Sequence, residues 1–164
     1  MKRKSVFSKL MGIVILLTAT LTLGGFFYTK VEAASLPSAP ADYYLDQTNL
    51  LTTQTKDLVA QKNAYYQTTK QKPQVILAVV KSTDGEDIDQ YAPKLFSKWG
   101  IGQKDTDNGI LILYALNDGD KNVRIEVGYG LEGAVTDAQA GQILRANATN
   151  LKSTDASKVN AGLQ

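Results

Sequence analysis

Apolar residues recur along the chain at spacings that predict helices and strands. Leu51, Leu58 and Tyr65 are seven residues apart, which places them on one face of a helix. We expect this helix to span residues 53–70. It should end before Pro73, because the residue that precedes a proline disfavours helical geometry. The first helix is therefore predicted between an N-terminal region and a strand.

Three shorter apolar segments have the character of strands. Residues 75–80 and 109–115 are continuous apolar runs, typical of strands that are covered on both faces. Residues 123–127 alternate between apolar and polar side chains, which predicts a strand with one open face. Turn-forming residues fill 117–122 between the last two segments, so we expect an antiparallel hairpin there.

Further helices are indicated between and after these strands. Residues 88–99 have apolar side chains at helical spacing and are followed by Gly100, a common helix terminator. Thr136 is placed to cap a third helix. A fourth helix should begin at Thr154 and Asp155 and still be running at Gln164, from which we expect that the chain continues.

The order of these elements predicts an α/β fold. The crossover helix makes the strands at 75–80 and 109–115 a parallel pair with a right-handed connection. The strand at 123–127 adds to the pair in the antiparallel direction. We therefore expect a three-layer α/β/α sandwich around a small mixed sheet, consisting of a parallel pair and an antiparallel hairpin strand.

The N-terminus is organised as a secretory signal. Residues 2–4 are basic, residues 10–23 contain no charge, and residues 31–33 end in small side chains that a signal peptidase reads. We expect cleavage after Ala33. The alternative is an uncleaved membrane anchor over residues 10–28, which could just span a bilayer.

This interpretation divides the chain into a signal peptide at 1–33, a linker at 34–41 and one domain at 42–164. The domain is then exported, on the extracellular or cell-surface side of a bacterial, Gram-positive-like membrane. Five of the 18 basic residues and one of the 16 acidic residues lie in 1–33, so the remainder has a net charge of −2. Nucleic acid is therefore not expected as a partner, because the basic surface that it needs is missing.

The composition also limits the chemistry. The chain has no Cys and no His, which excludes thiol and imidazole catalysis and the metal sites that these side chains build. A site must therefore use carboxylates, hydroxyls, amides, Lys or Arg. Hard cations such as calcium or magnesium prefer such oxygen ligands.

Two glycine-containing loops should meet at one edge of the sheet. Residues 100–109 precede one buried strand, and residues 128–133 follow its antiparallel neighbour. Their glycines would permit close backbone approach. Oxygen donors lie in or near these loops, and we expect the following side chains to bind calcium or magnesium: Asp46, Asp105, Asp107, Asn108 and Glu132.

Neither loop matches a known binding motif. Residues 105–109 resemble a calcium loop, but the glycine comes one place early and the final acid is missing. Residues 128–133 satisfy the string G-x-G-x-x-G, but they follow an antiparallel strand and do not open a helix, as a dinucleotide site requires. Turn geometry and solvated surface charge remain the alternative interpretations of these loops.

Over residues 42–164 the sequence resembles the TPM domain family. The resemblance rests on four segments in order, Tyr44-Leu45-Asp46 with Leu50-Leu51, Phe96-Ser97-Lys98-Trp99-Gly100-Ile101-Gly102, Asp107-Asn108-Gly109-Ile110-Leu111, and Arg124-Ile125-Glu126-Val127-Gly128-Tyr129-Gly130-Leu131-Glu132-Gly133. It implies a similar α/β sandwich. By position it implies these candidate residues: Asp46, Asp107, Asn108, Arg124, Glu126 and Glu132.

The resemblance leaves three functions open. Some family members resemble calcium-binding modules, plant members resemble acid phosphatases, and many bacterial members are envelope proteins that often carry a C-terminal membrane segment. The first hypothesis is an exported module that binds a divalent cation and an envelope protein or surface component, tethered through residues 10–28 or through a missing C-terminal segment. The alternative is a phosphatase with Asp107, Glu132 and Arg124 as catalytic residues. The third hypothesis is a purely structural domain.

Overall fold

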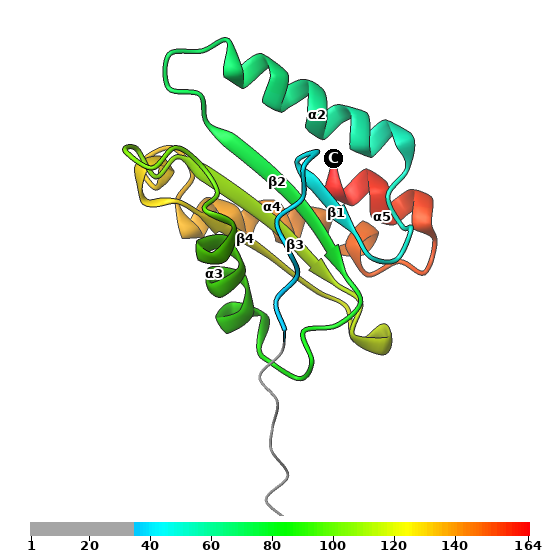
Figure 1. Cartoon of the computed structure of the whole chain (residues 1–164). Helices are drawn as coiled ribbons and strands as arrows, with labels where there is room; N and C mark the ends of the chain where they lie inside the picture. Colours follow the sequence, from blue (N-terminus) through cyan, green and yellow to red (C-terminus); the bar gives the residue numbers. More distant parts are fainter. Residues whose placement is uncertain (1–34) are drawn as a thin grey trace, which may run out of the picture. The chain divides into compact units, whose positions relative to one another are not determined.

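A computed structural model describes residues 35–164, which form an open mixed sheet with helices packed on it (Figure 1). The predicted signal peptide at 1–33, and with it the alternative of an anchor over residues 10–28, lies outside the described residues. The elements are β1 (Tyr44–Asp46), α2 (Thr53–Gln67), β2 (Gln74–Val80), α3 (Ile88–Trp99), β3 (Gly109–Ala115), β4 (Asn122–Val127), α4 (Asp137–Leu151) and α5 (Ala156–Leu163).

The sheet has the strand order β1-β2-β3-β4. Strands β2 and β3 are parallel, with Gln74 opposite Gly109, and β3 and β4 are antiparallel, with Ile110 opposite Val127. Both pairings confirm the prediction. The prediction lacked β1, which pairs in parallel with β2 at the edge of the sheet. Because β1 has three residues, it is too short to show an alternating pattern in the sequence.

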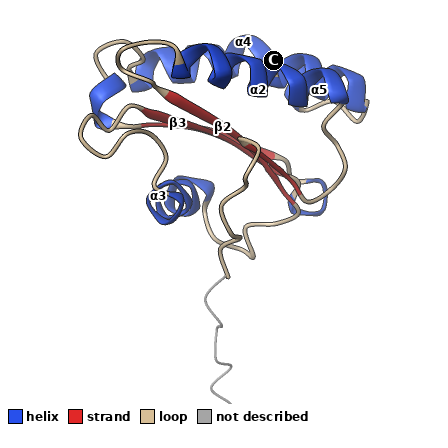
Figure 2. Ribbon diagram, turned by 45° about the horizontal axis from the view of Figure 1, so that its top comes forward, coloured by secondary structure: helices blue, strands red, loops and turns tan. Residues whose placement is uncertain are grey.

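Helices cover both faces of the sheet, as predicted (Figure 2). Helix α3 lies on one face, and α2, α4 and α5 lie on the other. Alternation along β2 supplies both cores: Ile76 and Ala78 pack in the cluster with α3, whereas Leu77 and Val79 pack in the cluster that contains Leu151 of α4. The continuous apolar run from Val75 to Val80 in β2 is thus explained by helices on both sides.

The helix ends differ slightly from the prediction. Helix α2 ends at Gln67 instead of residue 70, because Thr68 caps it and the chain then turns through Lys72 at a φ of 47°. Helix α3 ends at Trp99 as predicted, and Gly100 caps it with a left-handed φ of 60°. Helix α5 ends at Leu163.

In residues 35–164, no helix combines the length and the apolarity needed to cross a membrane.

The predicted linker at 34–41 is packed against the domain over part of its length. Leu36 contacts the core cluster on the α3 face. The indole nitrogen of Trp99 donates a hydrogen bond to the carbonyl of Pro37 at 2.9 Å, and Lys98 donates one to the carbonyl of Leu36 at 2.5 Å. The segment is therefore fixed along α3, because both of its hydrogen bonds come from the last turn of that helix.

Candidate functional site

The two glycine-containing loops meet at the amino edge of the β2–β3 pair, as predicted. The backbone N–H of Gly128 donates to the carbonyl of Gly109 at 2.8 Å, and the N–H of Gly130 donates to the carbonyl of Asp107 at 3.1 Å. The backbones are so close that a Cβ added at Gly130 would lie 1.7 Å from the carbonyl oxygen of Thr106. Glycine is required here for close approach, and not for a left-handed turn.

The predicted ligands at this edge have different environments. Asp105, Asp107 and Glu132 are exposed to solvent, whereas Asn108 is buried. The carboxamide of Asn108 is used at both ends, because it donates to the carbonyl of Gln71 at 2.6 Å and accepts from the N–H of Gln103 at 2.9 Å. Asn108 therefore organises the loop. Within residues 35–164, no group of three or more carboxylates is arranged to hold a metal ion.

Asp46 lies away from these residues, at the carboxyl edge of the sheet. It pairs with Val79 of β2, while Asp107 precedes the first residue of β3 at the other edge. Its side chain is only 4% exposed and accepts from the N–H groups of Leu51 at 2.9 Å and Leu50 at 3.1 Å. It also accepts from both the N–H and the hydroxyl of Thr48. Asp46 thus organises the turn between β1 and α2.

This environment predicts a pH-dependent stability. Burial by itself would raise the pKa of Asp46, but the hydrogen bonds from Leu51, Leu50 and Thr48 together leave the pKa below its ordinary value. A lowered pKa means that the unfolded chain takes up the proton first. The stabilisation is therefore present above a pH of about 4 and is lost as the pH falls toward the folded pKa. Urea unfolding from pH 7 to pH 2.5 should show this loss, and Asp46→Asn should reduce it.

Arg124 and Glu126 lie on β4 and connect it to α3. The Nε of Arg124 donates to Glu126 at 2.8 Å, and its Nη1 donates to Asp89 in the first turn of α3 at 2.8 Å. Burial would lower the pKa of Arg124, but the bonds and negative charges of Glu126 and Asp89 raise it. Two of the three guanidinium nitrogens are thus already engaged by carboxylates.

We expect Arg124→Gln to have a small effect on stability. The side chain is 31% exposed and its partner Asp89 is 70% exposed, so water competes for both charges. Exposed ion pairs contribute up to about 1 kcal/mol. Thermal unfolding in low and high salt should therefore show a loss below about 1 kcal/mol, which shrinks further at high salt. A loss several times larger would mean that the pair holds α3 on the sheet.

A hollow of 470 Å³ lies at the carboxyl ends of β2 and β3. In open α/β sheets, ligands bind outside this edge of the parallel strands. The hollow is lined by two loops, and its residues are Ser82, Thr83, Gly85, Glu86, Asp87, Asn117, Asp118, Asp120 and Asn122. Four of these are carboxylates and two are carboxamides, so the hollow is rich in oxygen atoms.

Hydrogen bonds tie the two loops of the hollow together. The N–H of Thr83 donates to the Asn117 carboxamide at 2.9 Å, and the N–H of Asn117 donates to the carbonyl of Lys81 at 2.9 Å. Within the first loop, the Thr83 hydroxyl donates to the carbonyl of Glu86 at 2.6 Å. Asn117 and Asp118 both have left-handed φ values, 43° and 53°. Asn and Asp are the non-glycine residues that tolerate this geometry best, which explains why they occur at this turn.

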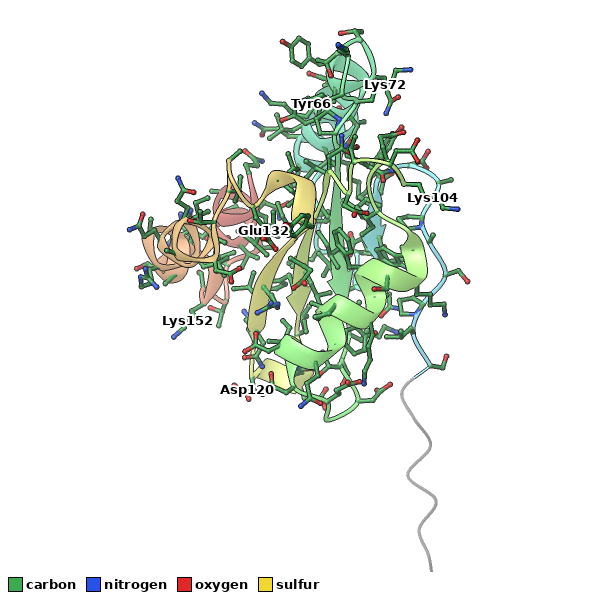
Figure 3. The ribbon with its side chains drawn as sticks, turned by 90° about the vertical axis from the view of Figure 1, so that its left-hand side faces the viewer. Tyr66, Lys72, Lys104, Asp120, Glu132 and Lys152 are labelled. Atoms are coloured by element: carbon green, nitrogen blue, oxygen red, sulfur yellow. The ribbon has the colours of Figure 1, made fainter. Side chains whose placement is uncertain are left out.

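The hollow has a negative potential. Burial raises the pKa of the Tyr91 hydroxyl on α3, and the negative charges of Asp84 and Glu86 raise it further. One carboxylate of the hollow, that of Glu86, is partly neutralised because it forms an ion pair with Lys94. Figure 3 shows Asp120 at this end of the molecule, and Lys72 and Lys104 toward the other end. The arrangement can attract a cation.

Sequence reasoning missed this hollow although its signals were present. Asp118-Gly119-Asp120 looks like an incomplete calcium loop, and three acids precede α3 at Asp84, Glu86 and Asp87. These acids have an adequate local explanation, because negative charge at a helix N-terminus complements the helix dipole. The predicted parallel pair already implied that both segments end at one edge, but the acids there were explained as helix and turn residues and were not combined into one site.

Comparisons with known proteins give the same fold. One solved structure, the N-terminal domain of a protein from P. gingivalis, has a TM-score of 0.61 at 21% identity and covers 74% of this chain and 77% of that one. The BA42 protein of Bizionia argentinensis has a TM-score of 0.51 at 16% identity, over 72% of this chain and 79% of its own. A search of curated proteins gives no significant match.

The family assignment rests on a match over most of the chain. The family model described as the TPM domain, which carries the name TPM_phosphatase, matches residues 44–163. This range begins at β1 and ends with α5, so it includes all strands and helices of the described residues. The mixed sheet, the helices on both faces and this match agree with one another, and the chain belongs to the TPM domain family.

Proposed function

We propose that this chain is an exported TPM domain that binds a divalent cation, calcium or magnesium, in the hollow at the carboxyl edge. The supporting observation is the hollow itself, in which four carboxylates and two carboxamides surround one space of 470 Å³. Hard cations are bound by such oxygen atoms, often with water molecules between the ion and the protein. A hollow of this size leaves room for a cation that keeps much of its water.

The carboxyl edge is a better place for the cation than the amino edge that the sequence suggested. Asp105, Asp107 and Glu132 are exposed, as are Asp87, Asp118 and Asp120 of the hollow, but Lys104 precedes Asp105 at the amino edge. The carboxylates of the hollow line one space from two hydrogen-bonded loops, but no three of them are grouped closely enough to hold an ion directly, so water molecules must complete its coordination. Because the two loops already hold the carboxylates near one another, binding an ion requires little rearrangement. The carboxylates are nevertheless solvated, so we expect weak binding that depends on charge and decreases with salt.

Calorimetric titration with calcium and magnesium tests this proposal. The variant is the pair Asp118→Asn and Asp120→Asn, which removes two charges and retains the shape of the side chains. Asn is also accepted at the left-handed φ of Asp118. We expect the affinity to fall by at least about tenfold, the equivalent of about 1.4 kcal/mol.

The matched control is the pair Asp105→Asn and Asp107→Asn at the opposite edge. It removes the same charge, and Asp107 also has a left-handed φ, of 44°. The proposal requires this pair to retain the wild-type affinity. An equal loss in both pairs would indicate only the general effect of net charge, and a loss in the control alone would place the cation at the amino edge.

Export and an envelope partner complete the proposal. The support is the order of basic, uncharged and small residues in 1–33 and the net charge of −2 in the remainder. The partner is then an envelope protein or surface component that the cation-bound edge contacts. N-terminal sequencing of protein recovered from culture medium should give Ala34 as the first residue. A chain that remains in the membrane fraction with residues 10–28 intact would support the anchor instead.

A phosphatase is the second candidate, because the matching family model carries that name. The predicted catalytic set was Asp107, Glu132 and Arg124. Two carboxylates already engage Arg124, which leaves one guanidinium nitrogen for a phosphate. Release of p-nitrophenol from its phosphate tests this function. Equal rates in the wild type and in Asp107→Ala, Glu132→Ala and Arg124→Gln would exclude the predicted set as its catalytic residues.

A further inference from the structure

A second hollow of 190 Å³ lies between α4 and the strands β3 and β4, and its residues Lys121 and Val123 alternate along the chain with Asp120 and Asn122 of the acidic hollow. We call it the α4 slot. Its walls are mostly apolar, and its lining residues are Tyr114, Lys121, Val123, Leu144, Arg145, Ala148, Leu151 and Lys152. The slot shares no residue with the acidic hollow, so its function can be tested separately.

The floor of the α4 slot is held in place by a buried contact. The hydroxyl of Tyr114 donates to the carbonyl of Leu151 at 2.7 Å, and both residues belong to the core. Ala148 and Leu144 of α4 line the space beside this contact. The apolar part of the slot is therefore preformed, and a ligand would not need to separate packed side chains.

Three cations surround the apolar part. Lys121 donates to the carbonyl of Ser153 at 2.5 Å, which fixes its ammonium group beside the slot. Arg145 and Lys152 are exposed, and Figure 3 shows Lys152 at this side of the molecule. Among residues 35–164, none of the three forms an ion pair, and no acidic side chain lines the slot. The rim thus has a net charge of +3 on a domain that is acidic as a whole.

The geometry points to the α4 slot as a binding site for a single-chain anionic amphiphile, a molecule with one alkyl chain and a carboxylate head. The apolar walls remove the chain from water, which is favourable in proportion to the apolar area buried. The three cations stabilise the head, and Arg145 can bind a carboxylate through two parallel hydrogen bonds. Neither the alkyl chain nor the carboxylate head would bind well alone, because the apolar area of the slot walls is small and the three cations of the rim are solvated.

The size of the slot limits the ligand further. A cavity of about 150 Å³ in another protein is large enough to bind benzene. The α4 slot has 190 Å³, so it accommodates a short length of hydrocarbon. It is smaller than the range of about 300–1,000 Å³ that is typical of sites for larger ligands. One chain therefore fits, whereas the two chains of a membrane phospholipid do not.

The experiment follows the methyl groups of Leu144, Ala148 and Val123 by NMR during titration with octanoate, which supplies a carboxylate and a short chain. The matched probes are 1-octanol, which lacks the charge, and octylammonium, which reverses it. We expect octanoate to bind at least about tenfold more tightly than 1-octanol. Octylammonium should leave the methyl signals unchanged, and added salt should weaken the binding of octanoate.

Two variants separate the roles of shape and charge. Ala148→Leu fills the slot with a good helix former and should reduce octanoate affinity at least about tenfold while the protein stays folded. Arg145→Gln should reduce it about threefold to tenfold, by removal of one charge-assisted contact. The control is Lys158→Gln, an exposed cation of α5 that does not line the slot, and it should retain the affinity. Melting temperatures confirm that each variant is folded.

Three results would overturn the inference. Equal binding of the three probes would show apolar contact without recognition of a head group. Unchanged octanoate affinity in Ala148→Leu would place the ligand elsewhere. Methyl signals that shift with protein concentration, together with dimer formation in sedimentation velocity, would show that a second copy of the chain covers the slot.

Discussion

Replacement of Gly130 by alanine should destabilise the protein by about 3 kcal/mol or more. The added Cβ would lie 1.7 Å from the carbonyl oxygen of Thr106, a distance at which one of the two backbones must move. That movement would break the hydrogen bond from the N–H of Gly130 to the carbonyl of Asp107. Chemical denaturation measures the loss, and amide exchange should show it as faster opening of both loops.

Gly133→Ala is the matched control, since it makes the same substitution three residues later. A Cβ at Gly133 meets no atom within 4 Å. Its stability should therefore remain within about 0.5 kcal/mol of the wild type. If Gly130→Ala were as stable as Gly133→Ala, the two loops would not be in contact, and the close approach at the amino edge would be contradicted.

Asp46→Ala should be the second strongly destabilising change, with a loss of about 3 kcal/mol. Its carboxylate accepts hydrogen bonds from the backbone N–H groups of Thr48, Leu50 and Leu51. Alanine would leave these donors without their acceptor in a region that is largely removed from water. Urea unfolding at pH 7 measures the loss, and the variant should also lack the acid-dependent destabilisation of the wild type.

Asp42→Ala provides the comparison for Asp46. Asp42 is exposed, and within the described residues its side chain forms no ion pair. We expect its removal to change stability by less than about 0.5 kcal/mol. Under conditions where Asp46→Asn stays folded, its calcium affinity should equal that of the wild type. A tenfold lower affinity in that variant would instead make Asp46 a metal ligand.

Most of the fold could be predicted from the hydrophobic pattern. The runs at 75–80 and 109–115 are buried on both faces by helices, so their uninterrupted apolarity is a direct consequence of the layers. The hairpin was predicted from its turn-forming residues, and the structure shows a short 3-10 turn there at Asn117–Gly119. Strand β1 was missed because three residues are too few to show an alternating pattern of apolar and polar side chains. Its position in the sheet depends on pairing with β2.

The candidate site was less accessible to sequence reasoning. The contact between the two glycine-containing loops could be predicted, because antiparallel pairing fixes which strand ends meet. The roles of the polar residues could not be predicted. Asp46 and Asn108 are oxygen donors in the sequence, but the structure uses their oxygen atoms for backbone hydrogen bonds. The sequence does not distinguish an Asp whose carboxylate accepts backbone hydrogen bonds from an Asp whose carboxylate binds a cation.

Manganese titration followed by NMR is the measurement that tests the proposed cation site most directly. Mn²⁺ resembles calcium and magnesium in its preference for oxygen ligands, and it broadens the signals of nearby nuclei. We predict that the amide signals of Thr83, Asp87, Asp118 and Asp120 broaden first, and that excess magnesium restores them. Early broadening at Asp107 and Glu132 with sharp signals around the acidic hollow would contradict the account.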